Sequence, residues 1–504
     1  MARYNHFTYG NGTKYGQRAP QNSLSWVLQV DWDNDGIFNG DNEAERMKSL
    51  LLRRGRENYV RSDGSGFEDV RAGTVTIILD NSDGRYDPYN SGSPIYPYVR
   101  PGVKCYLWVQ DDLDWTRYNV FYGYINDIQP KGGIDEQVRM EIVDGITILS
   151  QQDIQDVLYE NLLVADAIAM ILSSCGWDGG SVIEDNKDTL PYWWTMDKKG
   201  WQAIDELCNA FLGRAFVDVD GKLRFYSRHH IGTPEMTLTQ DKLLKEIVIP
   251  QPWEVVRNRI YVTARPRKRY DGVEIWRMQD VVYLGAGDSV EIWANYTYNN
   301  ESVPASDVIT PVATTDYLAN SASDGTGSDL TSSFSVTMTA FSAAAKLTVT
   351  NNGSNSGYIT FLRLRGNALS SINTTTILRE DTSSQNLYQI RTMRLDNEMI
   401  QDTNMAIDFA GFLRNKLSSP IKYPMIEVEG RANIQFALDL FDTVTLTVSA
   451  KAIDGDYDIA YVEHNWMDEG GNAVRTRFIL EPTEDFSGYW MFTTQIGISS
   501  VFAY

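Results

Sequence analysis

Short runs of alternating apolar and polar residues, separated by Gly and Asp turns, constrain the fold of this chain more than any other feature. Such alternation is typical of strands with one buried face. Runs of this kind lie at residues 74–79, 103–109, 120–125 and 138–143. The first of them ends at residues 80–84, Asp-Asn-Ser-Asp-Gly, which favour a turn. Strands at this spacing predict a first domain over residues 23–150 that is a small β-barrel or sandwich.

The spacing of apolar residues becomes helical in the next part of the chain. Residues 161–174 are apolar at helical spacing, and Ile204, Leu207, Cys208 and Phe211 form one stripe of a second helix. Asp220-Gly221 then lies between two short strand-like runs, as in a β-hairpin turn. We therefore predict a small α+β domain over residues 151–250.

Strand patterns resume after this domain and are interrupted once. Residues 251–284 and 378–482 predict a second β-barrel domain, with a helix at residues 403–417 that Thr403 caps. Residues 285–377 are rich in Ser, Thr, Asn, Gly and Ala but keep strand alternation, which predicts an inserted β-sandwich. Residues 1–22 and 483–504 are expected to be extended arms. The fold class is therefore mainly β with α+β parts.

Size and charge narrow the class of function. A chain of 504 residues is too long for one hydrophobic core. Its net charge of −22 argues against sequence-specific nucleic-acid binding and against adsorption on anionic membranes. The chain shows no signal-like apolar N-terminus, no run long enough for stable membrane insertion and no Cys-x-x-Cys pair. We expect protein partners and assembly in a reducing cytoplasm.

An acidic loop is the best local candidate for a metal site. Asp31, Asp33 and Asp35 occupy positions one, three and five of a calcium-loop spacing, and Gly36 occupies position six. Ile37 would offer its carbonyl oxygen at position seven, and Asn39 falls at position nine. A hard cation requires such convergent oxygens, so the loop predicts a candidate Ca²⁺ site; no other cofactor is expected.

The loop departs from the EF-hand rule in two respects. Position twelve is Asn42 rather than Glu, so Glu43 or Glu45 would have to complete the ligand shell. The flanking residues are strand-like rather than helical. An Asx-rich turn exposed to solvent is the alternative interpretation, and both stay open at this point.

The sequence contains few residues that could support catalysis, but it has aromatic residues that could bind a ligand. The sequence has four His and no G-x-S-x-G, H-E-x-x-H or Walker pattern, so we do not expect an enzyme. In and near the predicted insertion, Trp293, Tyr296, Tyr298 and Tyr358 could stack on the sugar rings of a host-surface glycan. Alternatively, the same rings fill the sandwich core or pack on a neighbouring subunit.

Two sets of segments follow one another in order along most of the chain. The early set comprises Arg54-Gly-Arg-Glu-Asn, Ala72-Gly-Thr-Val-Thr, Leu79-Asp-Asn-Ser-Asp-Gly-Arg-Tyr-Asp-Pro-Tyr-Asn90, Val99-Arg-Pro-Gly-Val103 and Phe121-Tyr-Gly-Tyr-Ile125. The later set comprises Gly200-Trp-Gln-Ala-Ile-Asp-Glu-Leu207, Asp218-Val-Asp-Gly-Lys-Leu-Arg-Phe225, Leu438-Asp-Leu-Phe-Asp-Thr-Val444 and Tyr457-Asp-Ile-Ala-Tyr-Val462. Together, these segments resemble the baseplate hub, tail-associated or minor tail proteins of tailed bacteriophages.

The resemblance implies a structural role in the virion tail. Hub proteins have two related β-barrel domains and form a ring, often a trimer, that adapts the tail tube to a central spike, fibre or tail-tip apparatus. It therefore implies a homo-oligomer, with a trimer favoured, that contacts tail tube, distal tail and spike or fibre proteins. Many relatives continue into a fibre or a wall-degrading domain, whereas this chain ends soon after Pro482. The alternative is a tail protein that binds or hydrolyses host-surface carbohydrate.

Overall fold

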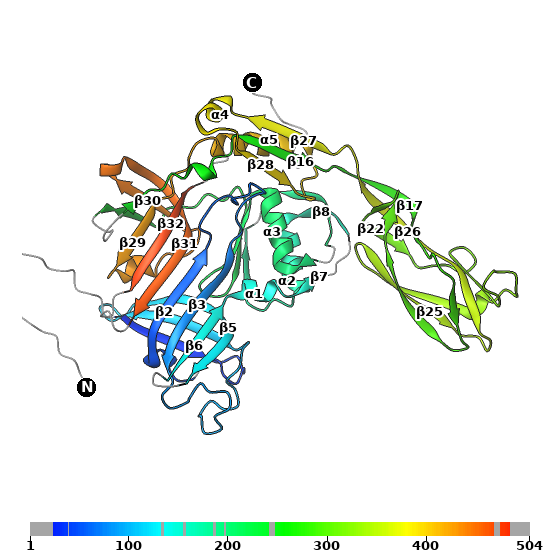
Figure 1. Ribbon diagram of the computed structural model, residues 1–504, viewed down its shortest axis with the longest axis horizontal. Helices are drawn as coiled ribbons and strands as arrows, with labels where there is room; N and C mark the ends of the chain where they lie inside the picture. The colour runs from blue at the N-terminus through cyan, green and yellow to red at the C-terminus, as the bar shows by residue number, and fades with distance from the viewer. Residues whose placement is uncertain are drawn as a thin grey trace, which may run out of the picture.

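The protein is mainly β in a computed structural model, which confirms the predicted fold class. The structure describes residues 24–483 except 39, 133–135, 155–157, 185–187, 196–197, 241–246 and 468–473. The expected arm at residues 1–22 and nearly all of the arm at 483–504 therefore lie outside the described residues. Figure 1 shows a body of strands and helices from which one elongated unit projects. Among the described residues, no helix is both long and apolar enough to cross a membrane.

Among the described residues, the largest sheet has twelve strands and begins with the predicted N-terminal strand region. Six strands follow one another in the order β1-β4-β5-β6-β3-β2, all antiparallel. Alternate side chains of β4 are buried, as the period-two pattern predicts. The strands are β1 Leu24–Val30, β2 Met47–Gly55, β3 Arg71–Asp80, β4 Lys104–Asp111, β5 Arg117–Lys131 and β6 Gln137–Val143.

The same sheet continues into the C-terminal part of the chain. Residues 49–55 of β2 pair with residues 461–467 of β31, and β31 also pairs with β32 and β30. The two strand-rich regions thus share one sheet, and no ladder among the described residues closes either of them separately. The 15-residue β31 is long enough to bridge both regions. The C-terminal strands are β29 Met425–Glu429, β30 Thr443–Val448, β31 Ile453–Met467 and β32 Arg475–Pro482.

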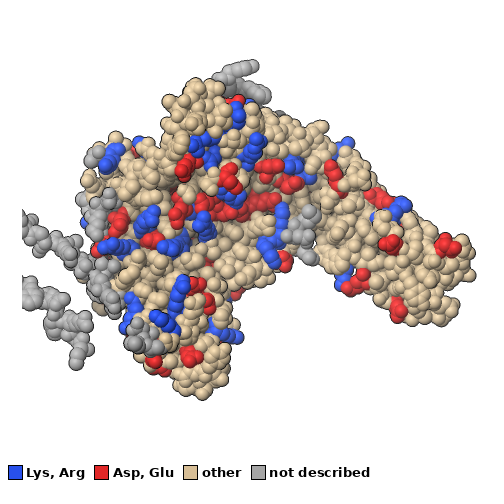
Figure 2. Space-filling view, viewed as in Figure 1, with Lys and Arg blue, Asp and Glu red and all other residues tan. Residues whose placement is uncertain are grey.

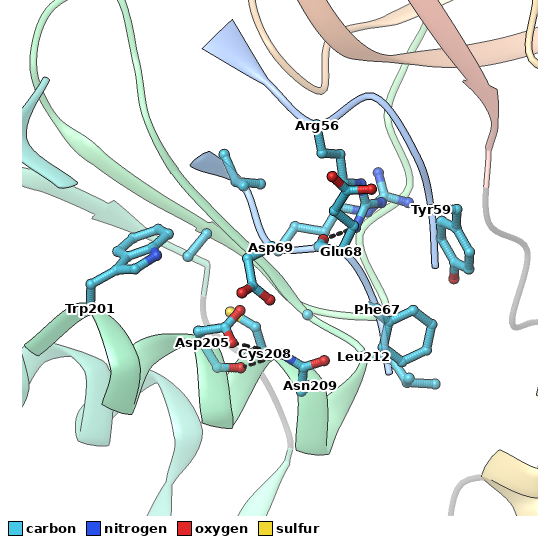
Figure 3. Close-up of a pocket in the computed structure, with 14 residues that line it drawn as sticks. Arg56, Tyr59, Phe67, Glu68, Asp69, Trp201, Asp205, Cys208, Asn209 and Leu212 are labelled. Carbon is cyan, nitrogen blue, oxygen red and sulfur yellow. Dashed lines mark hydrogen bonds between the residues drawn. The ribbon is translucent and has the colours of Figure 1, made fainter. Parts of the chain in front are cut away.

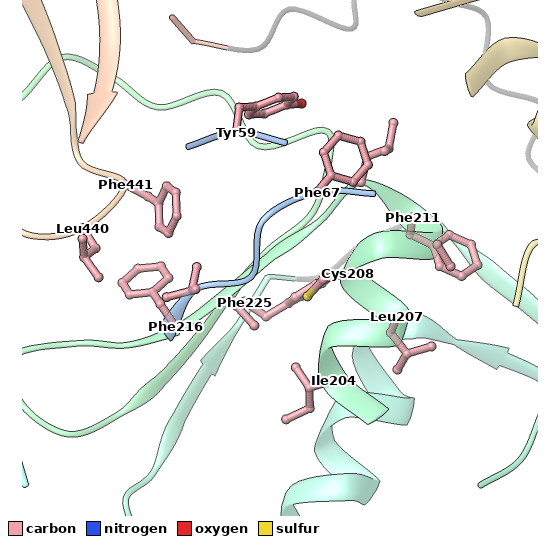
Figure 4. Packing of buried hydrophobic residues seen from close by; sticks show 14 of the residues in the cluster. Tyr59, Phe67, Ile204, Leu207, Cys208, Phe211, Phe216, Phe225, Leu440 and Phe441 are labelled. Carbon is pink, nitrogen blue, oxygen red and sulfur yellow. The ribbon is translucent and has the colours of Figure 1, made fainter. Parts of the chain in front are cut away.

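The α+β unit packs between these regions, and its boundary differs from the prediction. The stripe on α3 is buried as predicted: Ile204, Leu207, Cys208 and Phe211 belong to one buried hydrophobic cluster, part of which Figure 4 shows. The hairpin of β12 and β13 turns at Gly221, whose φ is +80°. However, β14 pairs with β30 and β15 pairs with β29, so residues 236–239 and 247–248 belong to the large sheet. The unit's elements are α1 Gly145–Leu149, β7 Asp153–Ile154, β8 Tyr159–Leu163, α2 Val164–Ser174, β9 Ser181–Ile183, β10 Thr189–Trp193, β11 Lys198–Lys199, α3 Gly200–Phe211, β12 Arg214–Val217 and β13 Leu223–Tyr226; β14 is Met236–Thr239 and β15 is Ile247–Val248.

A small sheet of three strands replaces part of the predicted second barrel. Its order is β27-β16-β28, and α5 packs against β16 and β27. Residues 259–264 therefore do not join the large sheet, although residues 251–284 were assigned to that barrel. The helix spans the predicted residues, but Asp402 rather than Thr403 caps it, by accepting from the N–H groups of Asn404 and Met405. The elements are β16 Arg259–Ala264, β27 Thr375–Glu380, α4 Thr382–Tyr388, β28 Thr392–Asp396, α5 Thr403–Leu417 and, before β30, α6 Ala432–Gln435.

The projecting unit in Figure 1 is the predicted insertion, with both limits shifted toward the N-terminus. Its first strand, β17, pairs with β26, so the insertion runs from Arg267 to Ser371 rather than over residues 285–377. Two layers, β17-β26-β18 with β22 and β23, and β19-β25-β24, enclose a hydrophobic core of their own. The strands are β17 Arg267–Arg277, β18 Val282–Leu284, β19 Ser289–Asn295, β20 Thr297–Tyr298, β21 Glu301–Ser302, β22 Ala305–Ile309, β23 Tyr317–Asn320, β24 Phe334–Ala340, β25 Ala344–Asn351 and β26 Gly357–Ser371.

Candidate functional site

Three segments that are far apart in the sequence meet where β2 ends. Arg54, the next-to-last residue of β2, is only 4% exposed, and its guanidinium forms an ion pair with Asp439. The same guanidinium donates to the carbonyl oxygen of Val217 at 2.5 Å. The second carboxylate oxygen of Asp439 accepts from the N–H of Val219 at 3.1 Å. One ion pair thus links β2, the β12–β13 hairpin and the loop that precedes β30.

Two further arginines, Arg56 and Arg214, extend this junction into the C-terminal strands. The buried guanidinium of Arg56 donates to Glu481 at 2.7 Å, and that of Arg214 donates to Asp458 at 2.6 Å. Both guanidinium groups lie over the ring of Phe441, at 5.7 Å and 5.2 Å from its centroid. Removing one partner of such a buried pair leaves an uncompensated charge, which typically costs about 3–5 kcal/mol. The junction therefore fixes the two parts of the large sheet and the α+β unit to one another.

Backbone geometry at Gly55 completes the junction. Gly55 has a φ of +97°, and a Cβ atom there would lie 2.1 Å from the carbonyl oxygen of Ala460. That carbonyl accepts from the N–H of Arg56 at 2.9 Å, so the two chains are in direct backbone contact. Only glycine permits this close approach of residue 55 to Ala460. Near this contact, burial raises the pKa of Asp442 to about 7, although its carboxylate accepts from the N–H of Asp439.

The junction brings together segments on which the sequence resemblance rests. Arg54-Gly-Arg, the hairpin around Asp218 and the run from Leu438 to Val444 all contribute contacts. These segments could be recognised in the sequence, but the roles of Arg54, Arg56 and Arg214 could not. Two arginines at the end of an apolar strand were the available signal. Their partners are hundreds of positions away and could not be identified from the pattern alone.

The acidic loop does bring its three aspartates together. One carboxylate oxygen from each of Asp31, Asp33 and Asp35 lies within 4.8 Å of the others. Asp31 is buried and accepts from the N–H groups of Asp35 and Gly36 at 3.0 Å each, whereas Asp33 and Asp35 are exposed. The N–H of Ile37 donates to Asp35 at 2.8 Å, and Asn39 lies outside the described residues. A carboxylate group of this kind is suited to a small hard cation.

Glu43 is not placed to complete that ligand set, which corrects one predicted residue. Its carboxylate is buried and accepts from the indole N–H of Trp32 at 3.0 Å, from Arg85 at 2.8 Å and from the hydroxyl of Tyr86 at 2.5 Å. Because the carboxylate of Glu43 accepts from these three donors, it is held in the protein interior. Burial, and then the charge of Glu43, raises the pKa of Tyr86. Glu43 thus connects the acidic-loop region to the Arg85-Tyr86 part of the resemblance motif instead of binding metal.

The four predicted glycan-binding aromatics do not form one site. Tyr296 is fully buried in the core of the insertion, so the prediction is wrong for this residue. Trp293 is 53% exposed and stacks on Phe341, with ring centroids 5.7 Å apart and an interplanar angle of 18°. Tyr358 lies on β26, in the other layer, and packs on Tyr283.

Tyr298 packs on Tyr270, with their ring centroids 4.9 Å apart. It lies on the short strand β20, which pairs only with β21 among the described strands. Trp293, Tyr298 and Tyr358 therefore belong to three different sheets. The only candidate among the four with a broadly exposed ring face is Trp293.

Comparison with known proteins gives a likeness in fold. No protein-family description matches the chain, and no curated protein matches it in sequence. The tail protein from Neisseria meningitidis MC58 is similar in structure, with a TM-score of 0.51 and 10% sequence identity, over 92% of this chain and 97% of that one.

Two further solved structures are also similar. They are a prophage MuSo2 tail protein from Shewanella oneidensis (TM-score 0.48, 10% identity, 90% of this chain and 98% of that one) and a prophage tail protein from Listeria monocytogenes (TM-score 0.42, 8% identity, 90% and 94%). The chain shares the fold of the Neisseria protein over nearly the whole length of both. The predicted likeness to tail proteins is thus confirmed at the level of the fold.

Proposed function

We propose that this chain is a structural protein of a bacteriophage-type tail, located at the tail tip and acting as a hub. The observation that carries the proposal is the fold shared with the Neisseria tail protein over 92% of this chain and 97% of that one. Fold alone does not specify function. The sequence resemblance supports the same role from separate observations, because its segments occur in the expected order along the chain.

In this role the chain forms a homo-oligomeric ring, with a trimer favoured, between the tail tube and a spike, fibre or tail-tip apparatus. The junction supports such a role physically. A hub must transmit load without deforming, and buried ion pairs at Arg54, Arg56 and Arg214 fix three parts of the body together. We propose a structural rather than a catalytic role, with assembly in the host cytoplasm and a final location in the virion tail.

Native mass measurement and electron microscopy of tails test this proposal together. We expect the purified chain to form a discrete ring-sized oligomer, and antibodies against it to label one end of the tail. A deletion of its gene should give tails that lack the tip structure. A monomer that labels no part of the tail would contradict the proposal.

A host-surface carbohydrate-binding, or hydrolysing, tail protein is the second candidate. The exposed Trp293–Phe341 stack on the projecting insertion favours it, because aromatic faces can stack on sugar rings. Trp293→Ala should abolish binding to host-surface polysaccharide. Trp115→Ala is the matched control, because Trp115 is 74% exposed but lies outside the insertion, between β4 and β5. Equal binding by both variants and the wild type would exclude Trp293 as the site.

We also propose that the acidic loop binds Ca²⁺ as a local structural brace. The converging carboxylates of Asp31, Asp33 and Asp35 support this proposal. Glu43 is excluded from the set, so water or loop carbonyl groups would supply the remaining ligands.

A further inference from the structure

One layer of the insertion, the sheet β19-β25-β24, turns a regular face toward solvent. Neither of its two ladders has a register shift, so the three strands form a continuous surface. Alternate side chains of a strand point to opposite sides, and the inward set, with Ala294, Val336 and Leu347, belongs to the core of the insertion. We call the outward set the hydroxyl face; it comprises Ser289, Glu291 and Trp293 of β19, Lys346, Thr348 and Thr350 of β25, and Ser335, Thr337 and Thr339 of β24.

Most side chains of the hydroxyl face end in a hydroxyl group. Thr337 and Thr348 lie directly opposite each other in the ladder of β24 and β25. Among the described residues, the hydroxyl groups of Thr337, Thr339 and Thr348 have no hydrogen-bond partner, and Thr337 and Thr339 are exposed. A hydroxyl group both donates and accepts, so it can pair with the hydroxyl groups of a ligand in either direction. Three neighbouring side chains are thus available to a ligand that is itself rich in hydroxyl groups.

Trp293 adds an aromatic ring to the same face. Its cross-strand neighbour is Lys346, which in turn lies opposite Thr339, so the ring is one row away from the pair Thr337 and Thr348. From Ser289 to Trp293 the strand rises by about 13 Å, and three strands are about 10 Å across. The face is therefore long enough for more than one sugar ring. A sugar ring has an apolar side that can stack on indole and hydroxyl groups around its edge.

The hydroxyl face carries no net charge. Lys346 and Glu291 are its two charged residues, and they form an ion pair with each other at 2.7 Å. By contrast, β17 and β26 in the other layer carry Arg277, Arg363 and Arg365. Figure 2 shows charged side chains densely over the body and more sparsely over the projecting insertion. The charge of the hydroxyl face thus matches an uncharged ligand better than an acidic one.

A cleft in the body differs from this face in its chemistry. α3 and the segment before β3 line the cleft, and Figure 3 shows the carboxyl groups of Asp69 and Asp205 facing each other there. Arg61 forms ion pairs with both, at 3.6 Å from Asp205. These charged groups of the cleft therefore hold one another, whereas the threonine hydroxyls of the hydroxyl face are available.

We propose that the hydroxyl face binds an uncharged, extended polysaccharide. One sugar ring stacks on Trp293, and the rings that follow it lie over the hydroxyl groups of Thr337, Thr339 and Thr348. An open sheet face does not enclose a single sugar, so binding depends on several rings of one chain. This inference rests on the second candidate function, carbohydrate binding, and adds to it the ligand class and the residues that contact the chain beyond Trp293.

Electrophoresis of the full-length protein in native gels that contain a polysaccharide tests the proposal. The uncharged probes are dextran, laminarin and galactomannan, and alginate is the acidic probe. We expect at least one uncharged probe to retard the wild type, equally at low and high salt, and alginate not to retard it. The double variant Thr337→Val, Thr348→Val should raise Kd by about tenfold, because it removes two hydrogen bonds and keeps the shape of both side chains.

A second double variant, Thr74→Val, Thr76→Val, is the matched control. Thr74 and Thr76 are an exposed and a half-buried threonine on β3 in the body, as Thr337 and Thr348 are on the hydroxyl face. The control should bind like the wild type. Valine is favoured in strands, so both double variants should keep the Tm of the wild type.

The outcomes separate the hydroxyl face from carbohydrate binding in general. If Trp293→Ala abolishes retardation but Thr337→Val, Thr348→Val binds like the wild type, the inference is overturned and the carbohydrate function stands. If no probe retards the wild type, both are overturned, and retardation by alginate alone overturns the inference. Thr348→Arg should leave the oligomeric mass unchanged; an altered mass would mean that a neighbouring copy covers this face, which also overturns the inference.

Discussion

His464 is a buried titratable group at the centre of the large sheet. It lies on β31, its Nδ1 atom is 2.8 Å from the hydroxyl of Thr476 on β32, and its ring packs on Phe436. Burial, and then the charge of Arg54, lowers the pKa of His464 from 6.5 to about 3. The folded protein therefore holds this imidazole neutral over a pH range in which the unfolded chain protonates it.

This difference predicts acid destabilisation of the fold. Between pH 6.5 and about 3 the unfolded state binds one more proton at His464, so the free energy of unfolding falls as the pH falls. The loss is about 1.4 kcal/mol per pH unit, or about 2 kcal/mol at pH 5. Thermal melts at pH 7.5 and 5.0 should show a smaller drop in Tm for His464→Gln than for the wild type. Equal drops in Tm for the two proteins would show that another group causes the loss of stability at acid pH.

A second prediction for a single residue concerns the close contact at Gly55. Gly55→Ala should destabilise the protein by about 2–5 kcal/mol. The backbone at residue 55 has a positive φ, and an added Cβ would overlap the carbonyl oxygen of Ala460. Gly430→Ala is a matched control: Gly430 has a φ of +68°, but nothing lies within 4 Å of an added Cβ. Chemical denaturation should therefore show a cost of only about 1 kcal/mol for Gly430→Ala. Equal costs would mean that backbone strain, not contact with β31, explains the requirement for glycine.

At the scale of elements, the acidic loop between β1 and the 3-10 helix Glu43–Arg46 offers a test with metal. If the loop binds Ca²⁺, saturation at about 100 times Kd adds about 2.7 kcal/mol to the free energy of unfolding. Differential scanning calorimetry should then show a higher Tm with Ca²⁺ than with EGTA. The double variant Asp33→Asn, Asp35→Asn should remove that difference without changing the EGTA-treated Tm greatly, because both side chains are exposed. Asp87→Asn, in another surface loop, is the control, and an EGTA-insensitive wild type would contradict the proposal.

The elements that the sequence predicted well are those whose pattern is local. The helix at residues 403–417 and the buried stripe of α3 follow from spacing alone. The aspartates of the acidic loop also meet because they lie within five positions. By contrast, the residues of β14 and β16 did not indicate which sheet each strand would join. The partners of a strand can lie far away in the sequence, as β30 does for β14 and β27 for β16. The domain boundaries at residues 250 and 285 were misplaced for this reason.

Side-chain roles failed in the same way where they depended on distant partners. Glu43 looked like a free carboxylate near the acidic loop, but Arg85 and Tyr86, more than forty positions later, occupy it. Tyr296 looked like a surface ring, yet the facing layer of the insertion covers it. The sequence thus predicted contacts between residues that are close in the chain, but not the contacts between distant residues.

The whole molecule combines a body braced by buried ion pairs with an insertion that is nearly independent. The insertion has its own hydrophobic core, and its contacts with the body include the ion pairs Arg267–Glu398 and Arg269–Glu160 and the Ser342–Thr195 hydrogen bond. Because β16 and β27 pair at Ala264 and Thr375, a short connection can replace the insertion without moving either strand. This arrangement separates assembly from any binding that the insertion performs.

Deletion of the insertion therefore distinguishes the two functional proposals. Residues 268–370 would be replaced by Asn-Gly, which keeps the Arg267–Ser371 rung, where the guanidinium donates to the hydroxyl at 2.7 Å, and supplies a two-residue hairpin turn. We expect the shortened chain to keep the oligomeric mass and Tm of the body, because the deleted residues contribute no strand to the large sheet. If tails assemble but no longer adsorb to host cells, the insertion is the receptor-binding part and Trp293→Ala should reproduce the defect. If tails fail to assemble although the shortened chain is folded, the insertion contacts another tail protein, and the carbohydrate proposal loses its support.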